Sequence, residues 1–102
     1  MKRPDIIERI QHAAMPSEPK FTLWLYGSEA RGDARPDSDI DILVLVDAES
    51  VSLRDQMAIN APLFDIELDT GIQINTHTEP RATWEARKSV FTHNVNKERI
   101  AL

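Results

Sequence analysis

The chain has no cysteine among its 102 residues, which removes disulfides, thiol chemistry and thiolate zinc sites from consideration. It also has no apolar run long enough for a transmembrane helix. Near the start, Asp5, Glu8 and Arg9 interrupt the apolar core that a signal peptide would need. We therefore expect a cytoplasmic protein with no membrane partner.

Positive charge is also scarce, since 12 Lys and Arg face 17 Asp and Glu and the net charge is −5. A protein that holds nucleic acid through its phosphates is usually basic, so nucleic acid is not an expected partner. The length fits one domain over residues 1–102, and 41% hydrophobic residues supply one modest core. A small phosphate ligand held through metal, or another protein, is the expected partner.

Local patterns predict the order helix, strand, strand, helix, strand, helix. Apolar residues at spacings of four, four, three and four predict the second long helix, and these are Leu53, Met57, Ala61, Phe64 and Leu68. Ser50 or Ser52 would cap it and Pro62 would kink it, although alternation over 64–69 also suits a strand. The predicted main helices cover 4–14, the stretch from Leu53 to Leu68, and 78–88, with a brief helical turn over 28–31 and a further short helix over 89–96. The predicted strands cover 21–26, 39–46 and 72–76.

These elements predict an α/β (α+β) domain, with a small mixed twisted sheet of three or four strands and helices packed on one face. Trp84 is expected to pack in the core or at an interface. The apolar end at 100–102 is expected to dock on the sheet or on a partner. The three histidines, His12, His77 and His93, have no metal-ligand spacing.

Two aspartates at the start of the second strand carry the strongest chemical signal. Residues two apart in a strand point to one face, so Asp39 and Asp41 project together while Ile40 faces the other way. Neighbouring carboxylates repel each other, and a divalent ion relieves that repulsion. Hard oxygen ligands suit Mg²⁺, which completes its shell with water and substrate phosphates. The pair therefore predicts a Mg²⁺ site.

A Gly-Ser pair at the end of the first strand predicts a phosphate site beside it. Gly27 lets the backbone approach a phosphate closely, and N–H groups at the following helix start can hold phosphate oxygens. The Ser28 hydroxyl adds a donor. Arg31 or Arg35 could offset charge on a triphosphate, and Ser38, next to the first carboxylate, is a further candidate.

The pattern Gly27-Ser28, ten residues, then Asp39-Ile40-Asp41 resembles the signature of the nucleotidyltransferase superfamily that includes DNA polymerase beta. The segment 30–38 is similar to the loop of minimal nucleotidyltransferases, and the resemblance is specific from Tyr26 to Val46. It implies the nucleotidyltransferase fold. It also implies Mg²⁺-dependent transfer of a nucleotidyl group, AMP from ATP above all, to a hydroxyl on a protein or small molecule.

The resemblance further implies roles for particular residues. Asp39 and Asp41 would be the catalytic metal ligands, and Gly27 and Ser28 would hold the phosphates. Ser38 and Arg31 would assist. Many minimal members resemble antitoxins paired with a helical HEPN-type toxin onto which they transfer AMP, so such a toxin is an expected partner.

One departure from the family pattern concerns a third carboxylate on a later strand, which would act as general base. Gln73 stands where that acid is expected. Glu67 or Asp69 could substitute, or metal alone could activate the acceptor. Catalysis could also be lost with nucleotide binding kept. The alternative function is accordingly a binding module, an antitoxin or scaffold that acts by contact.

Overall fold

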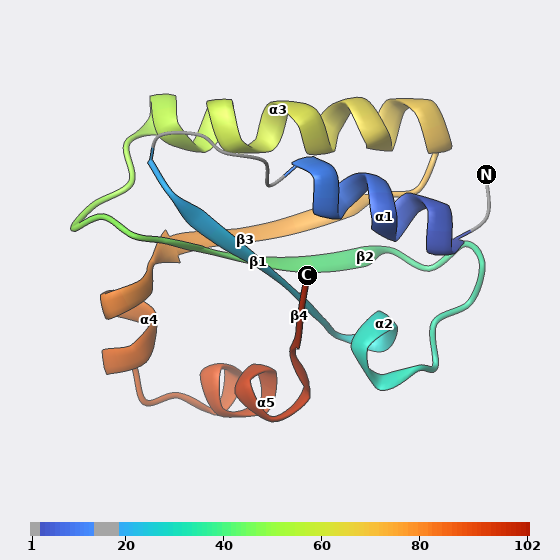
Figure 1. The fold of residues 1–102 in the computed structure, drawn as a ribbon. Helices are drawn as coiled ribbons and strands as arrows, with labels where there is room; N and C mark the ends of the chain where they lie inside the picture. Colours follow the sequence, from blue (N-terminus) through green and yellow to red (C-terminus); the bar gives the residue numbers. More distant parts are fainter. Residues whose placement is uncertain (1–2, 14–18) are drawn as a thin grey trace.

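A mixed four-stranded sheet forms the centre of the computed structural model, which describes residues 3–13 and 19–102 (Figure 1). The strands are β1 (Phe21–Tyr26), β2 (Ile40–Val46), β3 (Ile74–Pro80) and β4 (Ile100–Ala101). They lie in the order β3-β2-β1-β4. β1 pairs antiparallel with β2 and β4, whereas β2 pairs parallel with β3. The predicted mixed sheet is confirmed, with four strands.

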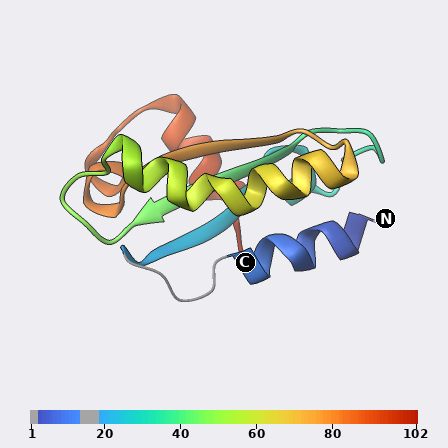
Figure 2. The same ribbon diagram turned by 90° about the horizontal axis from the view of Figure 1, so that it is seen from above.

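Helices cover both faces of this sheet. The helices are α1 (Arg3–Ala13), α2 (Ser28–Arg31), α3 (Leu53–Thr70), α4 (Arg81–Ala86) and α5 (Val90–Glu98). α1 and α3 lie side by side on one face, and α4 and α5 lie on the other (Figures 1 and 2). Within the described residues, no helix combines the length and apolar character needed to cross a membrane.

The expectation that helices cover one face only is wrong, and the composition of β2 gives the reason. Ile40 and Ile42 belong to the core cluster under α1 and α3, while Leu43 and Leu45 belong to a second cluster that includes Trp84 and Val95. A strand that is apolar on both faces must be covered on both. Two layers of helix follow from that requirement.

α3 shows how local signals set the ends of a helix. Ser52 is its N-cap, because the Ser52 hydroxyl accepts the Asp55 N–H at 3.0 Å and the Asp55 carboxylate accepts the Ser52 N–H in return. The helix continues past Pro62 and ends at Gly71, which has a left-handed conformation. The helical interpretation of 64–69 is thus confirmed and the strand alternative is wrong.

The buried side of α3 is not the apolar stripe that predicted the helix. The buried residues are Ile59, Leu63 and Ile66, which pack on the sheet. The stripe of Leu53, Met57, Ala61, Phe64 and Leu68 lies on the exposed side. The spacing identified the helix correctly, but it marked the outer face.

β3 is longer than predicted and begins later. The sequence predicts a strand over 72–76 and a cap at Thr78 before a helix, whereas the strand runs through Pro80 and α4 begins at Arg81. β3 is paired with β2 along the whole of that strand, from Ile74 to Pro80. The parallel ladder overrides the local capping signal. At the other edge, the apolar end forms β4 on β1, which confirms that it docks on the sheet.

Candidate functional site

The two predicted aspartates meet at one side chain of β3. Asp41 stands beside Asn75 in the parallel register. The Asn75 amide Nδ2 donates to Asp41 Oδ1 at 3.1 Å and to Asp39 Oδ2 at 3.4 Å. The carboxylates therefore share one face of the sheet, as their two-residue spacing predicts, and both reach a common point.

The amide at that point belongs to Asn75, and the expectation that Gln73 occupies it is wrong. Gln73 Nε2 donates instead to Asn75 Oδ1 at 2.8 Å and so holds the Asn75 amide in orientation. β3 begins two residues later than predicted, so Gln73 precedes the strand and Asn75 lies within it. Neither side chain can accept a proton as a carboxylate does.

Neither acidic residue proposed as a substitute lies at this site. Glu67 Oε1 accepts the Ile74 N–H at 2.8 Å, and Asp69 pairs with Arg9 of α1 at 2.9 Å. Both belong to α3, which packs on the opposite face of the sheet from the aspartate pair. That explanation for the missing third carboxylate is therefore wrong.

Gly27 is placed against the aspartate pair at the end of β1. Its neighbour Tyr26 pairs with Asp41 across the antiparallel ladder. Gly27 has φ 73° and ψ −151°, a conformation that is essentially limited to glycine. A Cβ at this position would overlap Asp41 Oδ2. Glycine is thus required both for the backbone turn and for the close approach to the carboxylate.

Two phosphate-binding candidates, Gly27 before α2 and Arg31 at its end, share a carboxylate from α5. Glu98 Oε1 accepts the Gly27 N–H at 2.9 Å, and Glu98 Oε2 pairs with Arg31 at 3.2 Å. Arg31 also contacts Asp33 at 3.4 Å. The hydrogen bond to Glu98, with a smaller one to Asp33, raises the pKa of Arg31. The Glu98 carboxylate is therefore already bound to the Gly27 N–H and the Arg31 guanidinium, the donors that a phosphate would need.

The other two predicted residues have separate places. Ser28 begins α2, and its carbonyl accepts the Asp33 N–H at 3.1 Å. The Ser38 hydroxyl accepts the Arg35 N–H at 2.8 Å, and the Ser38 N–H donates to the Arg35 carbonyl at 3.0 Å. Ser38 therefore shapes the loop that delivers Asp39 to the start of β2.

A cavity of about 570 Å³ lies between α2 and α5, next to Gly27. Its lining combines aromatic, amide and charged side chains, namely Tyr26, Arg31, Phe91, Asn94, Lys97 and Glu98, with Gly27 and Val95. Tyr26 and Phe91 meet edge to face at 6.0 Å. Burial, followed by the charge of Asp41, raises the pKa of Tyr26. The cavity thus borders the aspartate pair through Tyr26.

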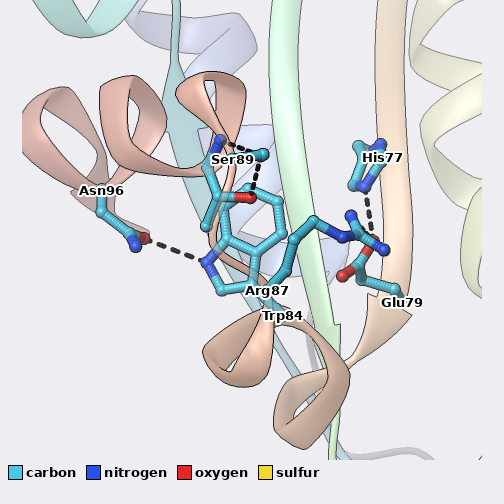
Figure 3. Close-up of polar contacts among 7 residues, drawn as sticks. His77, Glu79, Trp84, Arg87, Ser89 and Asn96 are labelled. Carbon is cyan, nitrogen blue, oxygen red and sulfur yellow. Dashed lines mark hydrogen bonds and ion pairs between the residues drawn. The ribbon is translucent and has the colours of Figure 1, made fainter.

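A polar network holds α4 and α5 under the sheet and so fixes this cavity (Figure 3). Buried Glu79 accepts from Arg87 at 2.8 Å and contacts His77 Nε2 at 2.7 Å. Trp84, buried as predicted, donates its indole N–H to Asn96 at 3.0 Å. These contacts tie the α4–α5 segment to β3 and link the two helices to each other.

The oxygen donors of the aspartate pair fit Mg²⁺. Mg²⁺ in proteins commonly takes one or two carboxylates and completes its shell with water and substrate phosphate. Across residues 3–13 and 19–102, no cluster of three or more His, Cys, Asp or Glu side chains forms a fuller metal centre. The two carboxylates are therefore suited to a metal that arrives with, or also contacts, a phosphate ligand.

Sequence reasoning missed three residues of this region. Asn75 could have been found only from the strand register, which local patterns do not fix. Glu98 is 71 positions from Gly27, and no sequence signal links them. Tyr26 was the exception with a usable signal, because it directly precedes Gly27 at the end of a strand.

The chain is similar to known proteins in sequence and in fold. The family model described as polymerase beta, nucleotidyltransferase matches residues 8–99. A protein described as a minimal nucleotidyltransferase is 22% identical, with a TM-score of 0.55, over 98% of this chain and 88% of its own. No curated protein matches the chain.

Two further solved structures are toxin–antitoxin complexes. One is a toxin–antitoxin with AMP-PNP, at 20% identity and TM-score 0.54, covering 97% of this chain and 71% of that chain. The other is a Y104A mutant of the toxin–antitoxin MntA-HpeT, at 19% identity and TM-score 0.58. The match covers 100% of this chain and 72% of that chain. At these identities the likeness shows a shared fold.

Proposed function

The chain belongs to the polymerase beta nucleotidyltransferase family, and we propose that it transfers AMP from ATP to a hydroxyl group with Mg²⁺ as cofactor. The observation that carries the proposal is the convergence of Asp39 and Asp41 on the Asn75 amide, directly beside Gly27. Carboxylates next to a glycine turn bring a metal site and a phosphate site into contact. That juxtaposition is what nucleotidyl transfer needs.

Each residue has a separate task in this proposal. Asp39 and Asp41 would hold Mg²⁺, which would neutralise charge on the triphosphate and polarise the α-phosphate. Gly27 and Ser28, at the start of α2, would hold the β- and γ-phosphates through backbone N–H groups and a hydroxyl. Arg31, the last residue of α2, would add positive charge to the cavity that Gly27 also lines.

The reaction would form a bond between the acceptor oxygen and the α-phosphorus and would break the bond to the β-phosphate. Pyrophosphate would leave, and the acceptor hydroxyl would lose its proton to water. Asn75 orients both carboxylates but cannot take that proton. We therefore expect slow turnover relative to an enzyme with a carboxylate at this position.

A protein hydroxyl is the acceptor we propose. Two of the similar structures are toxin–antitoxin complexes, and one of these contains AMP-PNP. By this likeness we propose that the chain acts as an antitoxin, with a helical HEPN-type toxin as its partner. The acidic balance of the chain favours a protein over nucleic acid as the acceptor.

Calorimetry with ATP, followed by a transfer assay, tests this function. Wild type should bind ATP with Mg²⁺ but not with EDTA, and label from the α-phosphate should pass to the acceptor. Asp39→Asn and Asp41→Asn should abolish transfer. Asp37→Asn is the matched control, because Asp37 is an exposed aspartate of the adjoining loop. Equal transfer by all four proteins would refute the assignment.

A second candidate function is a module that binds nucleotide or a partner without catalysis. Two observations favour it, the amide of Asn75 where an acid is expected and the carboxylate of Glu98 on the Gly27 N–H. In that case Asp39→Asn would retain full activity in cells, such as neutralisation of a co-expressed toxin. Loss of that activity, with the fold intact by circular dichroism, would favour transfer.

A further inference from the structure

The outer side of α3 exposes a continuous apolar stripe. Its large members are Leu53 at 73%, Met57 at 65%, Phe64 at 55% and Leu68 at 67% exposure, with exposed Ala61 between them. Figure 2 looks onto this layer and shows no helix or strand of the described residues over α3. Scattered apolar residues on a surface are ordinary, but a contiguous row marks an interaction site.

The geometry of a helix gathers these five residues into one band. At 100° per residue, the positions 53, 57, 61, 64 and 68 fall within about 80° of the helix circumference. The buried residues Ile59, Leu63 and Ile66 lie on the opposite side. α3 is therefore apolar along two sides, of which the sheet covers one.

The stripe reads almost the same in both directions along the helix. Leucines stand at its two ends, Met57 and Phe64 stand inside them, and Ala61 lies near the middle. When two copies pair antiparallel, Leu53 faces Leu68 of the second copy and Met57 faces Phe64. Such a pairing is self-complementary, as a two-fold interface requires.

The charged residues beside the stripe favour the same arrangement. Arg54 and Asp65 are exposed and lie on the same side of the stripe, and neither has an ion pair within the described part of the chain. In an antiparallel pair this side meets its own copy, so Arg54 of each chain lies near Asp65 of the other. A parallel two-fold pair would instead place Arg54 and Asp65 of the two copies at opposite edges of the interface, where they could not pair.

We propose that α3 is a self-association surface through which two copies of this chain pair antiparallel. The stripe has five residues, whereas a standard interface has roughly 20–30 residues per partner, so we expect a dissociation constant on the order of micromolar. The aspartate pair lies on the opposite face of the sheet. Pairing through α3 therefore leaves both nucleotide sites accessible.

Sedimentation equilibrium from about 1 to 200 µM tests the surface, a range set by the expected micromolar constant. Wild type should pass from the 11.6 kDa monomer to twice that mass as concentration rises. Phe64→Lys and Met57→Glu should each raise the dissociation constant at least tenfold. Val90→Lys is the matched control, because Val90 is an apolar residue of α5 with 78% exposure. Circular dichroism checks the fold of every variant.

A charge exchange tests the antiparallel geometry. Arg54→Glu and Asp65→Arg should each weaken association, because each places like charges together twice in the dimer. The double variant should recover most of the wild-type affinity. If both single variants weaken association and the double variant does not recover it, the antiparallel geometry is wrong. A wild type that stays monomeric at 200 µM would overturn the proposal. If, in that case, the stripe variants lost binding to a co-expressed toxin, the surface would be a binding site for a different protein.

Discussion

Glu98 and Gly27 lie 71 positions apart in the chain, yet the Glu98 carboxylate accepts the Gly27 N–H at 2.9 Å. The same carboxylate pairs with Arg31. A triphosphate that used Gly27 and Arg31 would have to displace Glu98, because two anions cannot share these donors. The end of α5 therefore opposes nucleotide binding in this conformation.

Removal of the Glu98 charge is expected to strengthen nucleotide binding. Glu98→Gln should lower the dissociation constant for ATP with Mg²⁺ by about tenfold, the size expected for one like charge within a few ångströms of a phosphate. Titration calorimetry measures the change. Glu85→Gln is the control, since Glu85 is an exposed acid of α4 outside the cavity lining.

An unchanged or weaker affinity in Glu98→Gln would show that the carboxylate does not compete with the phosphates. Loss of the fold would be visible as a lower melting temperature without ATP. That melting experiment therefore separates a change in competition from a change in the position of α5.

Gly27→Ala is expected to lower the free energy of unfolding more than the same substitution at another glycine of positive φ. The new Cβ would overlap Asp41 Oδ2, and the backbone conformation of Gly27 is one that alanine avoids. We expect a loss of about 3 kcal/mol in unfolding free energy and loss of ATP binding. Urea unfolding and calorimetry measure the two effects.

Gly71→Ala is the matched control for that substitution. Gly71 has φ 73°, and a Cβ there would meet no atom of residues 3–13 and 19–102 within 4 Å. The expected loss is about 1 kcal/mol from the left-handed conformation alone, with ATP binding retained. Equal losses for the two variants would mean that the contact with Asp41 contributes nothing.

Local sequence patterns are sufficient to place the elements on either side of Gly27. The strand Phe21–Tyr26 and the helical turn Ser28–Arg31 have the bounds that the sequence predicts. An apolar run that stops at a glycine is a strong local signal, and the spacing of Asp39 and Asp41 sets their common face whatever the rest of the chain does.

Long-range relations were not predictable in the same way. The register of β2 on β3 decides that Asn75, and not Gln73, meets the aspartates, and register depends on the whole ladder. The apolar stripe of α3 that contains Phe64 faces outward because the sheet covers the other side of the helix. The Glu98 contact depends on how the α4–α5 segment folds back under the sheet.

Restoration of an acid on β3 should raise the activity that we propose. Asn75→Asp would place a third carboxylate against Asp39 and Asp41, where it could accept a proton from the acceptor hydroxyl. We expect the transfer rate to rise by about a hundredfold, within the range of general base catalysis. In EDTA the variant should melt at a lower temperature than wild type, because three carboxylates repel.

Gln73→Glu is the control for the added charge. The Gln73 side chain contacts Asn75 and not the aspartates, so its replacement should give a much smaller rise in rate. A larger rise from Gln73→Glu than from Asn75→Asp would contradict the register on which the site is built. The same assay, run with and without Mg²⁺, shows whether either gain needs the metal.

The single tyrosine of the chain offers a direct optical probe of the site. Burial, with a smaller contribution from the Asp41 charge, raises the pKa of Tyr26 above its ordinary 10.0. The folded protein therefore keeps the phenol proton to a higher pH than the unfolded chain. The contribution of Tyr26 to the free energy of unfolding is fully present below pH 10 and is lost as pH rises through the pKa of the folded state.

An absorbance titration at alkaline pH should consequently show a phenolate midpoint above 10 in wild type. Asp41→Asn should lower that midpoint only in part, because burial is the larger cause and remains. Tyr26→Phe should flatten the decline of urea stability above pH 10, since no phenol is left to ionise. A wild-type midpoint at the value of free tyrosine would contradict both causes. It would mean that Tyr26 is neither buried at the end of β1 nor close to the Asp41 carboxylate, which we propose as a metal ligand.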